Sequence, residues 1–268
     1  MQQLLLWQFL SHILSDFYLQ SDSFCKNKEC KAFRSWQLYA HIIIVFAIAW
    51  LFSFSLGFWK TALIIAGTHL LFDGLKGLTH NLKWHFKHKA LAQFVTRRVQ
   101  RAFFYDQILH LVVIVAVCYG CGETFYSMPQ WLPADSYVAV AIGVLLCLKP
   151  ANICIKQVFT IFNIQLPKNK EEKSDPTEIP IIANHEDNTG DLPNAGKVIG
   201  NAERSLTLIF ILLEQYAAIG FLMAAKSLLR FAEGDKAKSE YVLVGTLLSF
   251  FMAVAIGVII KIYFHISL

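Results

Sequence analysis

A histidine and an aspartate recur four residues apart in three apolar stretches of this 268-residue chain. Two pairs have the histidine first and one has the aspartate first: His12/Asp16, His69/Asp73 and Asp106/His110. Residues four apart lie on one face of an α-helix, about 6 Å apart along its axis. Imidazole and carboxylate groups placed in this way can bind a divalent transition metal or carry protons.

The composition indicates the kind of protein that must position these pairs. The chain is 56% hydrophobic and 16% charged, against about 25% charged in a typical soluble domain. Long apolar runs along most of the chain predict a multi-pass helical membrane protein in a lipid bilayer. We attribute the net charge of +5 to loop lysines that set membrane orientation, and we expect no nucleic-acid partner.

The expected fold is all-α, a polytopic transmembrane bundle of about six to seven spans. The sixth apolar segment is mixed, because it contains Glu203, Glu214 and Lys226, and whether it crosses simply is open. The expected segments cover residues 3–19, 36–54, 58–75, 102–120, 137–154, 198–231 and 241–264.

Two hydrophilic stretches separate these segments. Residues 76–101 combine basic and aromatic side chains, which predicts an amphipathic helix at the membrane surface. Residues 163–196 predict a flexible cytosolic loop. Either stretch is a candidate surface for a cytosolic protein partner, and a homo-oligomer is a further expectation. The predicted divisions are a bundle with the His/Asp pairs (1–160), the loop region (161–197) and the C-terminal transmembrane helices (198–268).

Alternation of the first four segments places all three pairs, together with His41, in the same leaflet. The polar loop 20–35 and the stretch 76–101 hold many of the basic residues, so this leaflet is expected to be cytoplasmic and the N-terminus outside. The same count places Lys226, Arg230, Lys236 and Lys238 outside, against the preference of basic residues for the cytoplasmic side, and their role is open.

A buried aspartate is costly unless it is paired or bound to a cation. The leading interpretation is therefore a metal centre that activates water for hydrolysis, with Zn expected and Fe or Mn as alternatives. A proton- or cation-coupled transporter or channel, and a membrane sensor or assembly partner with a structural His/Asp network, stay open. Catalytic roles are expected for Asp16, Asp73 and Asp106; the expected metal ligands are His12, Asp16, His41, His69, Asp73, Asp106 and His110.

Five further polar residues are candidates for substrate binding. Gln20, Lys76 and Gln107 lie close to the pairs in sequence and are expected to orient substrate or ligands. Glu203 and Arg204 are expected to bind an anionic group such as a phosphate.

Several of these motifs resemble those of a known family. They are H-x-x-x-D-F-x-x-Q at 12–20, H-x-x-x-D-x-x-K at 69–76, D-Q-x-x-H at 106–110, G-x-x-I-G-x-x-E-R at 196–204 and AIGFLMAAKSLLRF at 218–231. Together they resemble a bacterial family of multi-pass inner-membrane proteins classed as a domain of unknown function. The resemblance implies a protein of the bacterial inner (cytoplasmic) membrane, and it brings no activity.

A looser similarity, in the type and placement of residues only, is to membrane-bound metal-dependent hydrolases. That analogy supports the expectation of an enzyme acting on a membrane-proximal substrate. The soluble hydrolase motifs G-x-S-x-G and H-E-x-x-H do not occur in the sequence.

Overall fold

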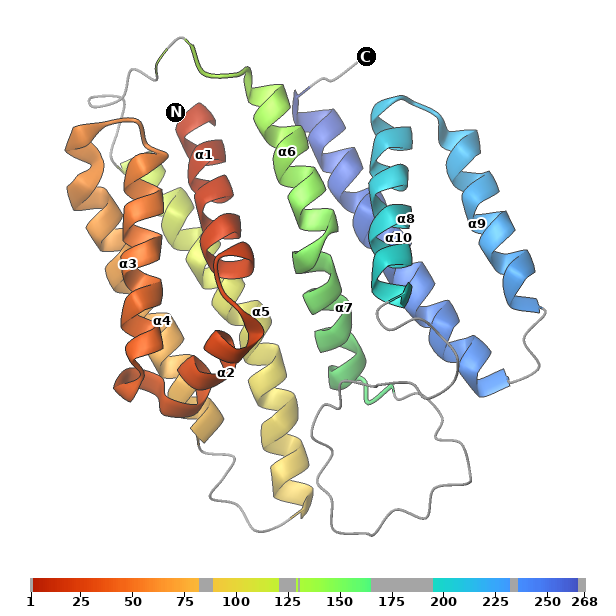
Figure 1. The fold of residues 1–268 in the computed structure, drawn as a ribbon, viewed down its shortest axis with the longest axis horizontal. Helices are drawn as coiled ribbons and strands as arrows, with labels where there is room; N and C mark the ends of the chain where they lie inside the picture. Colours follow the sequence, from red (N-terminus) through yellow and green to blue (C-terminus); the bar gives the residue numbers. More distant parts are fainter. Residues whose placement is uncertain are drawn as a thin grey trace. The chain divides into compact units, whose positions relative to one another are not determined.

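The structure is a computed structural model of the chain. It describes residues 2–81, 89–120, 129, 131–164, 195–231 and 236–264. Every regular element within these residues is helical (Figure 1), as the sequence predicts. The chain forms two compact units, an N-terminal unit of residues 1–150 and a C-terminal unit of residues 151–268.

The N-terminal unit is built around four helices that alternate in direction. Figure 1 shows α1 and α4 running one way and α3 and α5 running the other. The helix α6 packs against α1. The bounds are α1 Gln2–Ile13, α2 Asp22–Lys31, α3 Trp36–Leu51, α4 Trp59–Asn81, α5 Lys89–Gly120 and α6 Asp135–Cys147, with a π-helical turn η1 at Leu14–Tyr18 and 3₁₀ turns η2 at Ala32–Arg34 and η3 at Leu56–Phe58.

An apolar layer packs one end of these four helices. It contains three alanines, which let helix backbones approach closely, as is common between helices in membranes. The His/Asp pairs lie next to this layer, at the end of α1 and in the middle of α4 and α5, so the sequence separates a packed apolar layer from a polar one. The apolar layer consists of Leu4, Val45, Ala49, Phe58, Ala62, Ile65, Ala66, Ile114 and Cys118.

The stretch 20–35, expected to be a loop, contains the helix α2. Ser21 caps this helix by accepting a hydrogen bond from the backbone N–H of Phe24 at 3.3 Å. The helix ends at Ala32, whose φ of 47° turns the chain sharply. The corner after α2 then packs against α4, where Gly77 allows the close approach.

The separate surface helix expected over residues 76–101 is not found among the described residues. Residues 76–81 complete α4 and residues 89–101 begin α5, so the bundle helices extend into this stretch. Residues 82–88 lie outside the described residues.

The C-terminal unit holds most of α7 (Lys149–Ile161) and all of α8 (Ala195–Leu212), α9 (Tyr216–Phe231) and α10 (Lys236–Phe264). The flexible loop expected over residues 163–196 lies almost wholly outside the described residues. The sixth segment is not one straight helix. It breaks at Glu214, which has a φ of 60°, and α8 and α9 form a hairpin (Figure 1).

The hairpin accounts for the position of Lys226, one of the basic residues that a simple crossing of the sixth segment places outside. Because α9 runs back along α8, Lys226 returns to the level of Glu203 in the middle of α8, and their charged groups are 2.5 Å apart. At the other end of the hairpin Glu214 pairs with Lys261 of α10 at 2.6 Å. The acidic residues Glu203 and Glu214 are therefore each held by an ion pair within the C-terminal unit.

Two described helical segments are long and apolar enough to cross a membrane, Arg101–Gly120 and Ser239–Phe264. A third is added if α6 and α7 form one bent span. This is consistent with a membrane protein but is fewer than the six to seven spans expected. The difference arises because α1 and α3 are only 12 and 16 residues long, and α4 carries His69, Asp73 and Lys76.

Gly77→Ala tests how closely α2 and its corner pack on α4. A Cβ at this position would lie 2.9 Å from the Cα of Ala32, so the backbone must shift, at a cost of about 1–3 kcal/mol. We expect a lower melting temperature for the protein in detergent. Gly67→Ala, on the same helix with nothing within 4 Å of the added Cβ, is the control. Equal melting temperatures for the two variants would contradict the close packing.

Candidate metal centre

The structure brings all seven predicted histidine and aspartate ligands together in the N-terminal unit. They come from four helical segments that are far apart in the sequence. The alternating direction of these segments predicts that the residues lie at one level. Six of them are buried, and Asp16 is half-buried. They are His12 and Asp16 from α1 and its π-helical turn, His41 from α3, His69 and Asp73 from α4, and Asp106 and His110 from α5.

Asp16 lies at the centre of this cluster. It sits in the π-helical turn η1, where the backbone N–H of Leu19 donates to the carbonyl of Leu14 at 2.9 Å; such turns recur at functional sites. Both of its carboxylate oxygens face other members of the cluster. Oδ1 lies 3.5 Å from His41 Nε2, 3.7 Å from His12 Nδ1 and 3.8 Å from His69 Nε2, and Oδ2 lies 3.7 Å from His110 Nδ1 and 3.3 Å from Gln107 Nε2.

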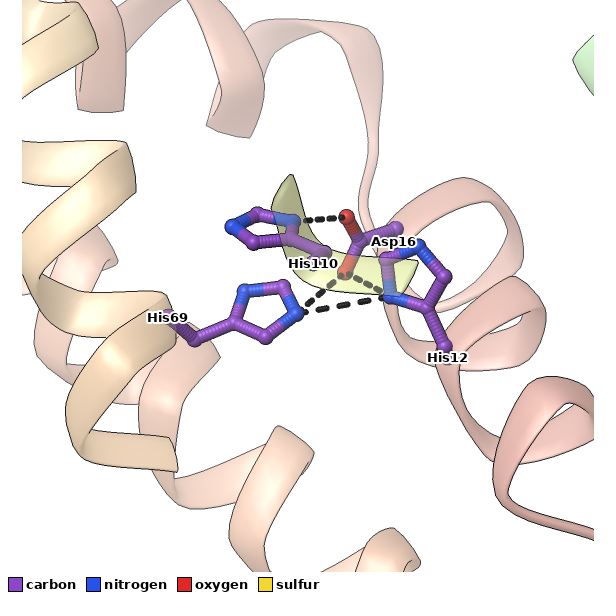
Figure 2. Close-up of side chains that lie close together, drawn as sticks. All are labelled: His12, Asp16, His69 and His110. Carbon is purple, nitrogen blue, oxygen red and sulfur yellow. Dashed lines mark hydrogen bonds and ion pairs between the residues drawn. The ribbon is translucent and has the colours of Figure 1, made fainter. Parts of the chain in front are cut away.

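Three of these atoms form a triangle with nearly equal sides (Figure 2). His12 Nδ1 and His69 Nε2 are 3.4 Å apart, and they lie 3.7 and 3.8 Å from Asp16 Oδ1. These separations exceed the usual hydrogen-bond range of about 2.7–3.2 Å. They are close to the spacing of about 3.4 Å between ligands of a tetrahedral ion with bonds near 2.1 Å. The triangle therefore suits a shared cation better than direct hydrogen bonds.

Two further ligand groups adjoin the triangle. His41, His69 and Asp73 form one, and Asp73, Asp106 and His110 form the other. His41 Nε2 lies 3.4 Å from Asp73 Oδ2, and His110 Nε2 lies 3.5 Å from Asp106 Oδ1. In each group the candidate ligand atoms lie within 4.8 Å of one another.

Several buried polar atoms of the cluster have no hydrogen-bond partner within the part of the chain that the structure describes. Buried nitrogen and oxygen atoms are hydrogen-bonded in the great majority of cases, so these atoms are available to another ligand or cation. They are His69 Nδ1, Asp106 Oδ1 and both ring nitrogens of His110.

Two lysines neutralise the outer carboxylates. Lys28 Nζ of α2 donates to Asp73 Oδ2 at 2.8 Å, and Lys76 Nζ donates to Asp106 Oδ2 at 3.2 Å. Burial disfavours the charged form of Lys28, but the carboxylates of Asp73 and Asp16 outweigh burial and raise the pKa of Lys28. Three carboxylates and two ammonium groups leave the cluster with one net negative charge when its histidines are neutral.

Sequence reasoning missed Lys28, because it lies in the stretch read as a loop. The helix itself had a sequence signal, the N-capping Ser21. The pairing of Lys28 with Asp73, 45 residues away, had none.

The predicted substrate-binding residues of the N-terminal unit also reach the cluster. Gln20 donates to His41 Nδ1 at 2.7 Å and to the carbonyl of Ser15 at 3.2 Å. Lys76 and Gln107 bind Asp106 and Asp16 as described. These side chains contact the candidate ligands, and their role toward a substrate stays a prediction.

Glu203 and Arg204 belong to the C-terminal unit, whereas the cluster belongs to the N-terminal unit. Glu203 is paired with Lys226. The Arg204 side chain is buried and ties α7, α8 and α10 together. Its guanidinium donates to Ser249 Oγ at 2.8 Å, Asn152 Oδ1 at 2.6 Å and Asn201 Oδ1 at 2.7 Å. Sequence reasoning missed these three acceptors, and the predicted phosphate-binding role stays a prediction.

Comparison with protein families matches residues 4–139 to a family described as "protein of unknown function (DUF3307)". The match covers just over half of the chain, so the chain belongs to this family. All seven histidines and aspartates of the cluster lie inside the matched region. Neither the comparison with curated proteins nor that with solved structures finds a match.

Lys28→Met tests the charge balance of the cluster. The change leaves the Asp73 carboxylate buried without its ammonium partner, and breaking a buried pair in this way costs about 3–5 kcal/mol. We expect a markedly lower melting temperature in detergent. Lys31→Met, an exposed position on the same helix, is the control and should melt like the wild type. If both variants melt like the wild type, the ion pair does not stabilise the fold.

Proposed function

We propose that this member of the DUF3307 family is an integral membrane protein whose His/Asp cluster binds a divalent transition metal ion for hydrolysis. The observation that carries the proposal is the triangle of His12 Nδ1, Asp16 Oδ1 and His69 Nε2, with sides of 3.4–3.8 Å. Two imidazoles and a carboxylate are a common ligand set for catalytic zinc, with a fourth position left for water.

The neighbouring side chains suit this ligand set. His41 and His110 lie beside the two oxygens of Asp16 and can complete or adjust the coordination. Zinc is the ion we expect, and iron or manganese would also accept imidazole and carboxylate ligands. A bound ion of this kind lowers the pKa of a coordinated water toward neutrality and so supplies a hydrolytic nucleophile.

Asp106 is the best placed of the three aspartates to act as a general base. Its Oδ1 is buried and has no hydrogen-bond partner among the described residues, so it can accept a proton. Asp73 is bound by Lys28 and faces His41, and Asp16 faces the imidazoles. We therefore assign Asp16 and Asp73 to binding the ion and stabilising the fold. In a centre with one ion, Asp106 is assigned to proton transfer.

The apolar layer favours this proposal over a transport path. On α4, Ala62, Ile65 and Ala66 lie one to two turns before His69, and on α5, Ile114 and Cys118 lie one to two turns after His110. These residues form one packed cluster at the far end of the bundle, whereas a transport path needs polar groups through both ends. A purely structural network would be expected to hydrogen-bond its buried atoms, whereas the His110 nitrogens face Asp16 and Asp106 at 3.7 and 3.5 Å, beyond hydrogen-bond distance.

We further propose a multi-pass protein of the bacterial inner membrane, with the cluster near the cytoplasmic surface and a lipid-linked or other membrane-proximal substrate. In this proposal the shorter helices of the N-terminal unit also enter the bilayer, giving about six to seven crossings. Its support is the family resemblance, the apolar helix Trp36–Leu51 and the basic residues near the cluster, since positive residues favour the cytoplasmic side.

Metal analysis of the purified protein tests the centre. We expect at least one divalent transition metal per chain, and at least a tenfold weaker affinity in Asp16→Asn, which keeps the size of the side chain but removes its charge. The same preparations should hydrolyse chromogenic ester or phosphoester substrates only when metal is bound. Asp135→Asn at the start of α6 is the matched control. Asp16→Asn protein with unchanged metal affinity would refute the proposed ligand set.

The orientation is tested by labelling a variant that retains Cys30 as its only cysteine. Cys30 is exposed on α2, at the end of the bundle that holds the cluster. We expect a membrane-impermeant maleimide to label it in inverted inner-membrane vesicles and not in intact spheroplasts. Labelling in intact spheroplasts would place the cluster on the outer side.

A further inference from the structure

The imidazole of His110 stands between two groups of candidate ligands. Its Nδ1 lies 3.7 Å from Asp16 Oδ2, on the side of the triangle. Its Nε2 lies 3.5 Å from Asp106 Oδ1, on the opposite side of the ring. Neither nitrogen has a hydrogen-bond partner among the described residues, although the residue is only 2% exposed. A buried imidazole without any hydrogen bond is unusual and points to a missing ligand on the Asp106 side.

Asp106 has the complementary arrangement. Lys76 binds its Oδ2 at 3.2 Å, while its Oδ1 is buried without a hydrogen-bond partner in the described part of the chain. The lysine thus holds the carboxylate with one oxygen directed at His110. Asp73 lies on the same side, and the ligand atoms of Asp73, Asp106 and His110 lie within 4.8 Å of one another.

We propose that Asp73, Asp106 and His110 form a second metal site, so that the centre holds two divalent ions, one on each side of the His110 ring, and Asp106 acts as a ligand in place of the general base that it would be in a one-ion centre. The inference rests on the proposed function for the first ion and its chemistry. The new observation is that His110 Nε2 and Asp106 Oδ1, which the triangle does not use, face each other at 3.5 Å without a hydrogen bond. Asp16 directs Oδ1 at the triangle and Oδ2 at His110 Nδ1, so the imidazole of His110 links the triangle to the second site.

The two sites differ in ligand type. The triangle has two imidazoles and one carboxylate, whereas the second site has two carboxylates and one imidazole. Carboxylate ligands favour harder ions such as Mn²⁺, so Mn²⁺ is the suitable probe for the second site.

Charge indicates what such a centre would act on. With no ion bound the cluster has one net negative charge, because two lysines offset two of its three carboxylates. Two divalent ions would leave three net positive charges, which a hydroxide and an anionic substrate group would offset. Paired metal ions stabilise both the attacking and the leaving oxygen in phosphoester hydrolysis. Phosphoesters are therefore the substrate class that this centre fits.

The test is a titration of the metal-free protein with Mn²⁺ in the presence of inorganic phosphate, with bound Mn²⁺ counted per chain. We expect two ions in the wild type and in the control Asp135→Asn, and one in Asp106→Asn. The ion that Asp106→Asn retains reports that this variant is folded. The electron paramagnetic resonance spectrum of the Mn²⁺-loaded wild type should also show a spin-coupled Mn²⁺ pair. This measurement does not depend on the folding of a variant.

The outcomes separate the two proposals. One ion in the wild type, with an uncoupled signal and no change in Asp106→Asn, would overturn the second site and leave the first intact. No bound ion in the wild type would overturn both.

Discussion

The burial of three carboxylates among four helices is the constraint on which the N-terminal unit depends. A charged group away from water is costly unless a counter-charge and hydrogen bonds compensate it. Asp73 and Asp106 each have a lysine partner, and Asp16 is surrounded by four imidazoles. Because these partners come from α1 to α5, the helices must meet at one level to satisfy the charges, and this explains why the polar layer is separate from the apolar layer.

The short helix α2 follows from the same constraint. After α1 the chain forms α2, which places the ammonium group of Lys28 beside Asp73. This helix is capped by Ser21 and ends at Ala32, which has a positive φ. That corner packs against the small surface left by Gly77 on α4. The π-helical turn after α1 contains Asp16 and sets the direction of its carboxylate before the chain turns into α2.

The sequence was sufficient to predict an all-helical fold and the meeting of the His/Asp pairs, since helical spacing and alternating segments fix both. It was insufficient wherever the outcome depended on contacts between distant residues. Nothing local marks Lys28 as the partner of Asp73, and nothing local predicts that the chain reverses at Glu214 to pair Lys226 with Glu203. By length and composition the described helices offer fewer spans than the apolar pattern predicts, because α1 and α3 are short and α4 carries charged and polar residues. The residues of 76–101 that the structure describes belong to bundle helices, because charged residues there continue α4 and α5 rather than ending them.

X-ray absorption spectroscopy of the zinc-loaded protein tests the central claim, a metal bound by His12, Asp16 and His69, most directly. It reports the type, number and distance of the ligands without assuming a reaction. The account predicts a first shell of nitrogen and oxygen at about 2.0–2.1 Å, outer-shell scattering from at least two imidazoles, and fewer imidazoles in His69→Ala. Sulfur ligands at about 2.3 Å, or a shell of oxygen alone without imidazole scattering, would contradict it.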